Sequence, residues 1–348
     1  MTSGLGLDGA YDATLDRIKG QGKAKSTLGI AALMWISRAE RPMHIGELCE
    51  ALGVEIGSRD MDRDNIPPEK TLLASCLGLA TVDESSVVRL VHFTLQEYFN
   101  QHSGHFKDPQ ETMAEVCLTY LNFDSVVGLS PSLGGAPVET RLLQYASSYW
   151  GLYARNGLTE GVKSLALRLL RKFGRHISAK LLWWNFPEWE RGLKYSEGFT
   201  GLHCAAYLGL DKIAIGLLKD VEGSGADMVD GWGCTPLMWA AGSGHEGMVK
   251  LLLDRKEVNP DSKDKDGKTP LWNAASGGHE GVVKLLLDRE EVNPKARDNH
   301  GRTPLMYAAK RGHDGIVELL QGRSDAESDT EADYLCMSAS SSESSGGW

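Results

Sequence analysis

A heptapeptide recurs three times in the C-terminal third of the chain: TPLMWAA at residues 235–241, TPLWNAA at 269–275 and TPLMYAA at 303–309. Successive copies are 34 residues apart. In every copy a glycine lies two residues before the threonine, and a Gly-His pair and then a Val/Leu-rich stretch follow the alanines. Self-similarity at a fixed period of this length predicts an array of stacked structural repeats.

Each recurring feature has a physical reason. Proline suits the first turn of a helix, where its missing N–H costs nothing. Paired alanines let a second helix approach closely, and the glycine that follows them ends the first helix. The Val/Leu stretch predicts the buried face of a second helix, and the polar stretch 259–267 predicts a turn or hairpin. The unit is therefore turn–helix–helix, and it buries its apolar face only by stacking on neighbours.

The unit resembles the ankyrin repeat, which implies an α-solenoid that binds protein partners. It departs from that pattern in two ways. The period is one residue longer than the usual 33. The histidine that commonly follows Thr-Pro-Leu is replaced by Met238, Trp272 and Met306, which predicts looser or more apolar repeats.

The array has unequal ends. A degenerate copy with Thr200, Gly201 and Leu202 precedes the three full copies and predicts an N-terminal cap. We therefore expect ankyrin repeats over residues 198–321. No matching cap follows Leu320, so we expect the apolar residues of the last helix to be partly uncovered unless the tail shields them. These residues are Ile316, Val317, Leu319 and Leu320.

The first part of the chain predicts a different fold. Apolar periodicity predicts helices over 24–38, 44–52 and 68–77, and strands over 79–82 and 87–91, with a further helix after His92. Three helices with a two-stranded wing are typical of a winged-helix domain, which we place at 24–104. Residues 105–197 are expected to be a helical linker domain. The predicted fold is thus mostly α.

This part resembles the winged-helix domain that follows the NACHT nucleotide-binding module in fungal NOD-like receptors, which are STAND signalling switches. The matching segments are 32–37, 41–42, 47–49, 54–57, 91–98, 117–121 and 145–151. The resemblance implies that 1–23 is a remnant of the nucleotide-binding module and that the repeats are a sensor. It also implies that His92 is a possible switch residue, because a histidine at this junction touches the bound ADP phosphate in STAND proteins. The alternative is that His92 caps or packs the junction.

The sequence predicts no cofactor, metal or catalytic site. A phosphate-binding Walker A loop fails at Gly22-Lys23, because Arg17 stands at the first glycine position and Ala24 at the hydroxyl position. The aspartates at 60, 62 and 64 fail as a calcium loop, because Asn65 and Thr71 replace the required glycine and glutamate. The histidines 245, 279 and 313 lie one repeat apart, too far for one zinc ion. No nucleophile or metalloprotease motif is present, so we expect a non-enzyme.

Composition supports this interpretation. The 348 residues carry a formal net charge of −10, which argues against nucleic-acid or membrane binding through bulk charge. Six scattered cysteines in apolar patterns, with no signal peptide and no apolar run of bilayer length, predict a cytoplasmic protein with free thiols. Residues 322–348 are rich in serine and acidic residues and are expected to be a disordered tail.

Partner binding is expected on the hairpin tips and the exposed side of each first helix. The candidate residues are Gly231, Trp232, Cys234, Gly242 and Ser243 in the first full repeat, Lys265, Asp266, Lys268, Ser276 and Gly277 in the second, and Asn299, His300, Arg302, Lys310 and Arg311 in the third. The cluster Arg302, Lys310 and Arg311 favours an acidic partner or the acidic tail of the same chain.

We therefore expect a non-catalytic protein-recognition module, the sensor portion of a NOD-like receptor-type protein. Its partner is a protein, and a NACHT module of full-length relatives is one candidate. The alternative is a DNA-binding regulator that uses the winged helix. That alternative is disfavoured because the third helix offers only Lys70 beside Glu69, and the wing only Arg89.

Overall fold

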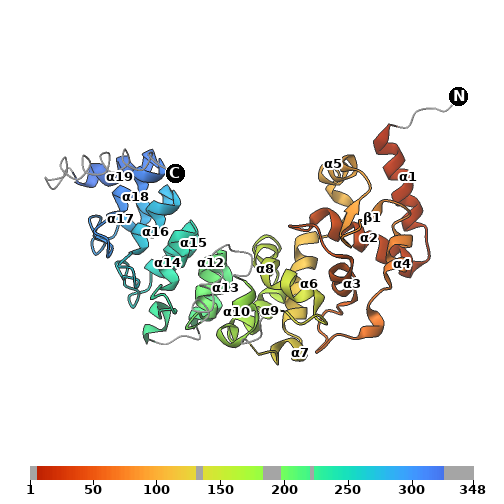
Figure 1. Cartoon of the computed structure of the whole chain (residues 1–348), viewed down its shortest axis with the longest axis horizontal. Helices are drawn as coiled ribbons and strands as arrows, with labels where there is room; N and C mark the ends of the chain where they lie inside the picture. The colour runs from red at the N-terminus through yellow and green to blue at the C-terminus, as the bar shows by residue number, and fades with distance from the viewer. Residues whose placement is uncertain (1–5, 131–135, 183–196, 220–222, 325–348) are drawn as a thin grey trace, which may run out of the picture. The chain divides into compact units, whose positions relative to one another are not determined.

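The computed structural model describes residues 6–130, 136–182, 197–219 and 223–324 (Figure 1). Most of the predicted tail therefore lies outside the described residues. The chain divides into two compact units, Met1–Gly192 and Leu193–Trp348. Helices dominate both units, with a winged helix in the first and ankyrin repeats in the second, so the predicted fold class is confirmed.

The winged helix contains the elements that the sequence predicts, with ends shifted by a few residues. Its elements are α1 (Leu7–Lys19), α2 (Lys23–Arg38), α3 (Ile45–Gly53), a 3-10 turn η1 (Arg63–Asn65), α4 (Glu69–Ser75), β1 (Ala80–Val82), β2 (Val88–Leu90) and α5 (Phe93–Gln101). The strands pair antiparallel with Thr81 opposite Arg89. An additional bridge beside β2 was not predicted: Val88 N donates to Met43 O (2.8 Å), and His44 forms an isolated antiparallel bridge with Val87.

Helix α1 is part of the winged-helix core. Its Leu15 and Ile18 are fully buried, and α1 packs against α2. Gly29 of α2 allows a close approach to α4, because a Cβ there would lie 2.5 Å from Ser75 O. The segment predicted as a remnant of another module thus contributes to the core of this one.

The rest of the first unit is helical, as expected. It comprises η2 (Ser103–His105), α6 (Pro109–Leu121), α7 (Asp124–Val127), α8 (Arg141–Asn156), α9 (Glu160–Leu170), η3 (Phe173–Arg175) and α10 (Ser178–Leu181). Helix α6 packs against both α8 and α9. The fully buried rings of Tyr145, Trp150 and Tyr153 lie along α8.

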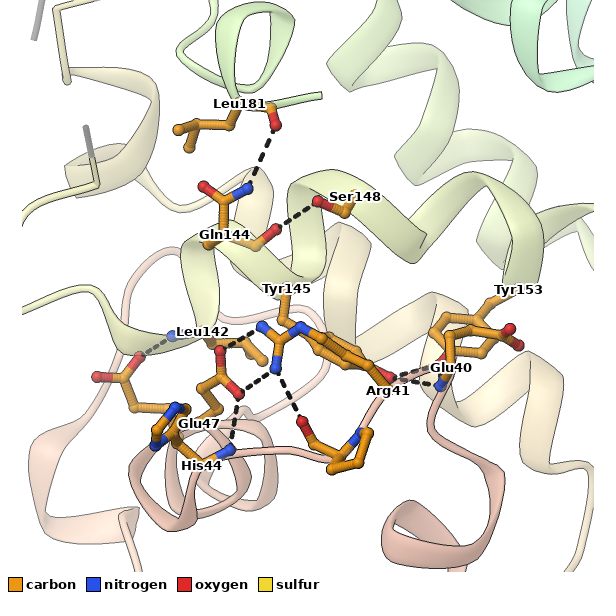
Figure 2. Close-up of polar contacts among 12 residues, drawn as sticks. Glu40, Arg41, His44, Glu47, Leu142, Gln144, Tyr145, Ser148, Tyr153 and Leu181 are labelled. Carbon is orange, nitrogen blue, oxygen red and sulfur yellow. Dashed lines mark hydrogen bonds and ion pairs between the residues drawn. The ribbon is translucent and has the colours of Figure 1, made fainter. Parts of the chain in front are cut away.

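A polar network fastens the loop before α3 to α8 (Figure 2). Arg41 donates both terminal nitrogens to the Glu47 carboxylate (2.6 and 2.8 Å), and its guanidinium lies 5.0 Å from the centre of the Tyr145 ring. Glu40 N donates to the hydroxyls of Tyr145 (3.2 Å) and Tyr153 (3.3 Å). A charge-assisted bidentate pair in partly buried surroundings fixes geometry as well as adding stability.

Glu50 makes a second connection between the same two parts. Its buried carboxylate accepts from the first backbone N–H groups of α8, Arg141 (3.2 Å) and Leu142 (2.9 Å). It also accepts from the hydroxyl of Tyr120 on α6 (3.0 Å). A carboxylate at a helix N-terminus satisfies unpaired N–H groups and complements the helix dipole. The winged helix and the helices after it therefore share one polar framework.

The second unit is a row of helix pairs. They are α12 (Gly201–Leu208) with α13 (Asp211–Lys219), α14 (Pro236–Gly242) with α15 (Glu246–Leu253), α16 (Pro270–Gly277) with α17 (Glu280–Leu287), and α18 (Pro304–Arg311) with α19 (Asp314–Ser324). A 3-10 turn, η5 (Gly223–Asp227), lies between the first two pairs. Each first helix packs on the first helix of the next pair, and each second helix likewise. The repeat unit deduced from the heptapeptide is confirmed.

The helix ends follow the sequence signals. The hydroxyls of Thr235, Thr269 and Thr303 accept from the backbone N–H three residues on, at 3.2–3.3 Å, and proline follows each threonine. Gly278 and Gly312 end α16 and α18 in the left-handed conformation. The missing histidine predicted looser or more apolar repeats. The caps are intact, and Met238 and Trp272, which stand at the position of the histidine, are buried apolar side chains.

The last helix differs from expectation in two respects. It continues to Ser324, past the predicted end of the array at 321. Val317 and Leu319 are half-exposed as expected, but Ile316 and Leu320 are buried at 1% and 3% exposure. That part of the prediction is wrong, because α19 packs against α18 of its own pair and α17 of the preceding repeat.

Candidate functional site

The hairpins of the repeats are joined side by side through their backbones. Lys265 N donates to Trp232 O (2.9 Å), and Asn299 N donates to Asp266 O (2.8 Å). Gly231 N likewise donates to Glu197 O (2.5 Å). The hairpin tips therefore form one continuous edge, on which residues 34 positions apart are neighbours.

A recurrent aspartate shapes each hairpin. One carboxylate oxygen of Asp230, Asp264 and Asp298 accepts from the backbone N–H groups two and four residues on, at 2.8–2.9 Å. This is the turn-forming bond that aspartate makes with its own backbone. The sequence analysis missed these aspartates, although their spacing of 34 was visible.

The second carboxylate oxygen of Asp230 bonds to a residue of the following helix, α14, and that of Asp298 to a residue of its own hairpin. Asp230 accepts from the indole N–H of Trp239 (2.8 Å), and Asp298 accepts from Arg302 Nε (2.9 Å). Burial alone would raise the pKa of the Asp298 carboxyl. Hydrogen bonds from the backbone of Arg302 and His300 and from the Arg302 side chain outweigh burial and hold the pKa below its ordinary value.

Two cations and two aromatic rings form a stack across the second and third repeats. The rings of Trp272 and Tyr307 lie 4.2 Å apart. Lys268 Nζ lies 4.7 Å from the centre of the Trp272 ring, and Arg302 Cζ lies 4.8 Å from that of Tyr307. Cation–π contacts of this kind hold long side chains in place. Both cations also pair with carboxylates, Lys268 with Asp266 (2.9 Å) and Arg302 with Asp298 (2.9 Å).

The fifth residue of each heptapeptide is half-exposed on the first helix: Trp239 on α14, Asn273 on α16 and Tyr307 on α18. We call these three residues, together with Lys268 and Arg302, the recognition stripe. None of the three helix residues was among the predicted binding residues, and neither was Trp272. Their signal was the variable fourth and fifth positions of an otherwise repeated heptapeptide.

The predicted partner-binding residues lie at the hairpin tips and at the C-terminal ends of the first helices, and all but one are exposed or half-exposed. Ser276 is buried at 7% exposure, and its carbonyl accepts from His313 (3.4 Å), so the prediction for Ser276 is wrong. It lies where the next repeat packs. The others are half-exposed or exposed, including Trp232 at a hairpin tip and Lys310 and Arg311 at the end of α18.

The three Gly-His histidines have a structural role. The Nε2 atoms of His245, His279 and His313 lie 2.9, 3.0 and 3.4 Å from carbonyl oxygens of the preceding first helix, those of Tyr207, Gly242 and Ser276. Each histidine thus satisfies a free carbonyl at a helix end and ties one repeat to the one before. Within the described ranges, no group of three or more His, Cys, Asp or Glu side chains is placed to hold a metal ion.

His203 was missed by the sequence analysis. It completes the motif Thr-Gly-Leu-His at residues 200–203. Its Nδ1 accepts from Thr200 N (3.1 Å), and its Nε2 lies 3.1 Å from Cys234 O in the next hairpin. Burial lowers the pKa of this imidazole. The degenerate repeat therefore keeps the histidine that the full repeats have lost.

His92 caps α5. Its Nδ1 accepts from Thr94 N (3.3 Å) and lies 2.8 Å from the Thr94 hydroxyl, and its ring lies 4.6 Å from that of Phe93. The capping role that was weighed against a switch is therefore present. A switch role stays a prediction.

The winged helix has few basic side chains on α4 and on the wing, the elements that would contact DNA. Lys70 is the one basic residue of α4, and Arg89 of the wing is paired with Asp83 (3.1 Å). Specific DNA binding requires side chains aimed at base edges and a basic surround. This geometry does not favour the DNA-binding alternative.

Two other features bear on function. Four of the free cysteines, Cys49, Cys76, Cys117 and Cys204, are buried, and Cys234 is half-buried. Burial raises the pKa of the Cys76 thiol to about 12, so this group is not a ready nucleophile. None of the helices in the described part of the chain is long and apolar enough to cross a membrane.

Comparison with protein families matches both units. Residues 152–264 and 247–332 match the model described as ankyrin repeats (3 copies), and together they cover more than half of the chain. Residues 11–109 match the GPI inositol-deacylase winged helix domain, a NACHT-associated domain. A search of curated proteins gave no match.

The ankyrin match begins inside α8, within the segment predicted as a linker. The pattern there is similar to that of the full repeats. Ala154, Gly157 and Val162 have the same spacing as Ala241, Gly244 and Val249. The Thr-Pro-Leu motif is missing, which is why the sequence analysis did not count this segment as a repeat.

Proposed function

The chain belongs to the ankyrin-repeat family, and from that premise we propose that it is a protein-recognition module that performs no chemistry on its partner. Ankyrin repeats suggest protein interaction. The proposal places binding on the hairpin edge and the exposed side of the first helices. The recognition stripe is the observation that carries it.

The stripe has the composition of a binding surface. Interfaces are enriched in tryptophan, tyrosine and arginine, and such residues carry most of the binding energy. Here Trp239 and Tyr307 are half-exposed although each is held by a neighbour, through the Asp230 hydrogen bond and the Arg302 cation–π contact. Because these side chains are already fixed, little conformational entropy is lost when a partner binds.

Charge favours a partner with carboxylates. Lys265 is exposed on the hairpin edge, and Lys310 and Arg311 are exposed at the end of α18. Lys268 and Arg302 are half-exposed on the hairpin edge and are already paired with Asp266 and Asp298. Asp266 is the one exposed acid among the candidate residues, and it is paired with Lys268 (2.9 Å). An acidic protein segment is therefore the partner chemistry that fits.

A more specific role for the protein follows from the resemblance of its sequence to NOD-like receptors. We propose a sensor or regulatory role in a NOD-like receptor-type protein in the cytoplasm, with His92 as a possible switch residue and a NACHT module as a possible partner. The NACHT-associated winged helix at residues 11–109 supports this. The domain boundaries 1–23, 24–104, 105–197, 198–321 and 322–348 belong to the same proposal.

The experiment compares partner capture by the full chain and by the variant Asn273→Glu. Asn273 lies at the centre of the stripe and is half-exposed, so a larger, negatively charged side chain blocks the surface and repels an acidic partner without emptying the core. The matched control is Lys284→Ala on the exposed side of α17, which changes the net charge by the same amount. We expect Asn273→Glu to lose the captured proteins and Lys284→Ala to keep them.

Circular dichroism confirms that both variants are folded. Equal capture by wild type and Asn273→Glu would contradict binding at the stripe. Loss in both variants would place binding elsewhere on the repeats.

A further inference from the structure

The last repeat exposes positions that the two before it bury. We call five half-exposed residues of α18, α19 and the preceding cap the open face: Thr303, Leu305, Met306, Ala309 and Val317. Their equivalents one repeat earlier are buried, namely Thr269, Leu271, Trp272, Ala275 and Val283. In those repeats the next helix pair covers them (Figure 1). The open face is thus an apolar stacking surface without a described neighbour.

Two cations lie beside the open face. Lys310 and Arg311 are exposed at the end of α18, and neither has an ion pair within the described residues. The equivalent residues in the second repeat are Ser276 and Gly277. The basic pair is therefore a feature of the last repeat and not of the repeat pattern.

The segment that continues from α19 has the complementary chemistry. Residues 325–333 contain five acidic residues at alternate positions, Asp325, Glu327, Asp329, Glu331 and Asp333, and no basic residue. An apolar run, YLCM, follows at residues 334–337. Along the chain, the acidic residues therefore come directly after α19, and the apolar residues follow them.

The distances permit contact. Helix α18 has eight residues and is about 12 Å long. Nine extended residues reach about 30 Å. Starting at Ser324, residues 325–333 can therefore pass along α18 to Lys310 and Arg311, and 334–337 can return over Leu305 and Met306.

We propose that residues 325–337 fold back onto the open face as an intramolecular cap. The acids pair with Lys310 and Arg311, and the apolar run covers Leu305 and Met306. Repeat arrays need terminal elements with a polar outer surface. The chain's own segment is favoured over a second copy, because it is tethered at high effective concentration and because two copies would bring like charges together. This proposal does not rest on the proposed function.

Zero-length carbodiimide cross-linking of the full chain, followed by peptide mass spectrometry, tests it. The reagent joins an amine to a carboxylate only where the two form a contact. We expect Lys310 to be joined to residues 325–333 several-fold more than Lys284, the exposed control lysine on α17. High salt and the double variant Tyr334→Ser/Leu335→Ser, which leaves every carboxylate in place, should each reduce the Lys310 product several-fold.

Equal yields at Lys310 and Lys284 overturn the proposal, and so does a product that appears only at the mass of a dimer. Hydrogen exchange provides a second readout. Neutralising the five acids to Asn and Gln should speed exchange of the α18 amides several-fold, while those of α14 stay unchanged. No change in α18 overturns the proposal.

Discussion

His176 is buried at 3% exposure and held as the neutral imidazole. Ser178 N donates to Nδ1 (3.1 Å), so Nδ1 must be an acceptor, and Nε2 donates to Leu121 O (3.0 Å). A second proton, on Nδ1, would point at the Ser178 N–H, and the buried imidazole has almost no contact with solvent that could stabilise its charge. Burial accordingly lowers the pKa of His176 to about 4, against an ordinary value of 6.5.

This residue makes stability depend on pH. Between pH 6.5 and 4 the unfolded chain takes up a proton at His176 that the folded chain does not. The contribution is therefore complete above pH 6.5 and is lost as the pH falls through this range, by up to about 3 kcal/mol. We expect urea unfolding of His176→Gln to show a shallower pH slope than wild type. The slope stays above zero, because burial also lowers the pKa of His203.

His300→Gln, at an exposed hairpin position, is the control and should keep the wild-type slope. If the free energy of unfolding falls with the same slope in His176→Gln and in wild type from pH 6.5 to 4, His176 is not held as the neutral imidazole.

At the scale of the element, alanine substitutions at two equivalent helix-ending glycines distinguish the cost of backbone strain from the cost of displacing a neighbouring side chain. Gly278 and Gly312 end equivalent helices with φ of +80° and +74°. A Cβ at Gly278 would lie 2.8 Å from Cε1 of His313, whereas a Cβ at Gly312 meets nothing within 4 Å. Gly312→Ala should cost about 1–2 kcal/mol for the left-handed conformation alone. Gly278→Ala should cost about 1 kcal/mol more, because His313 must shift from Ser276 O.

Urea unfolding of the two variants measures the difference, with the slope of the transition checked for constancy. Equal losses would mean that His313 moves freely and does not tie the repeats together.

The heptapeptide predicted its element well because each of its residues acts locally. Thr235 caps, Pro236 starts the helix, and the paired alanines permit close packing, so sequence and structure agree there. Residues whose role depends on a partner far along the chain were missed. Glu50 gave no signal, because its partners Tyr120 and Leu142 lie 70 and 92 residues away. Ser276 was misplaced because only the next repeat buries it.

At the scale of the molecule, two family matches define the chain: a NACHT-associated winged helix and ankyrin repeats. The first unit is fastened internally by the Arg41–Glu47 pair and the Glu50 carboxylate. The second is built by repetition and presents a rigid stripe of aromatic and basic side chains. The winged helix offers few groups for recognising DNA, and the repeats offer a surface suited to a protein.

The most direct test of recognition at the stripe is site-specific photo-cross-linking in cells. A benzophenone amino acid is placed at position 273, in the stripe, or at position 284, on the second helix of the same repeat. We expect a discrete protein adduct from position 273 and none from position 284. Adducts that are equal at both positions, or that form from position 284 alone, would contradict recognition at the stripe.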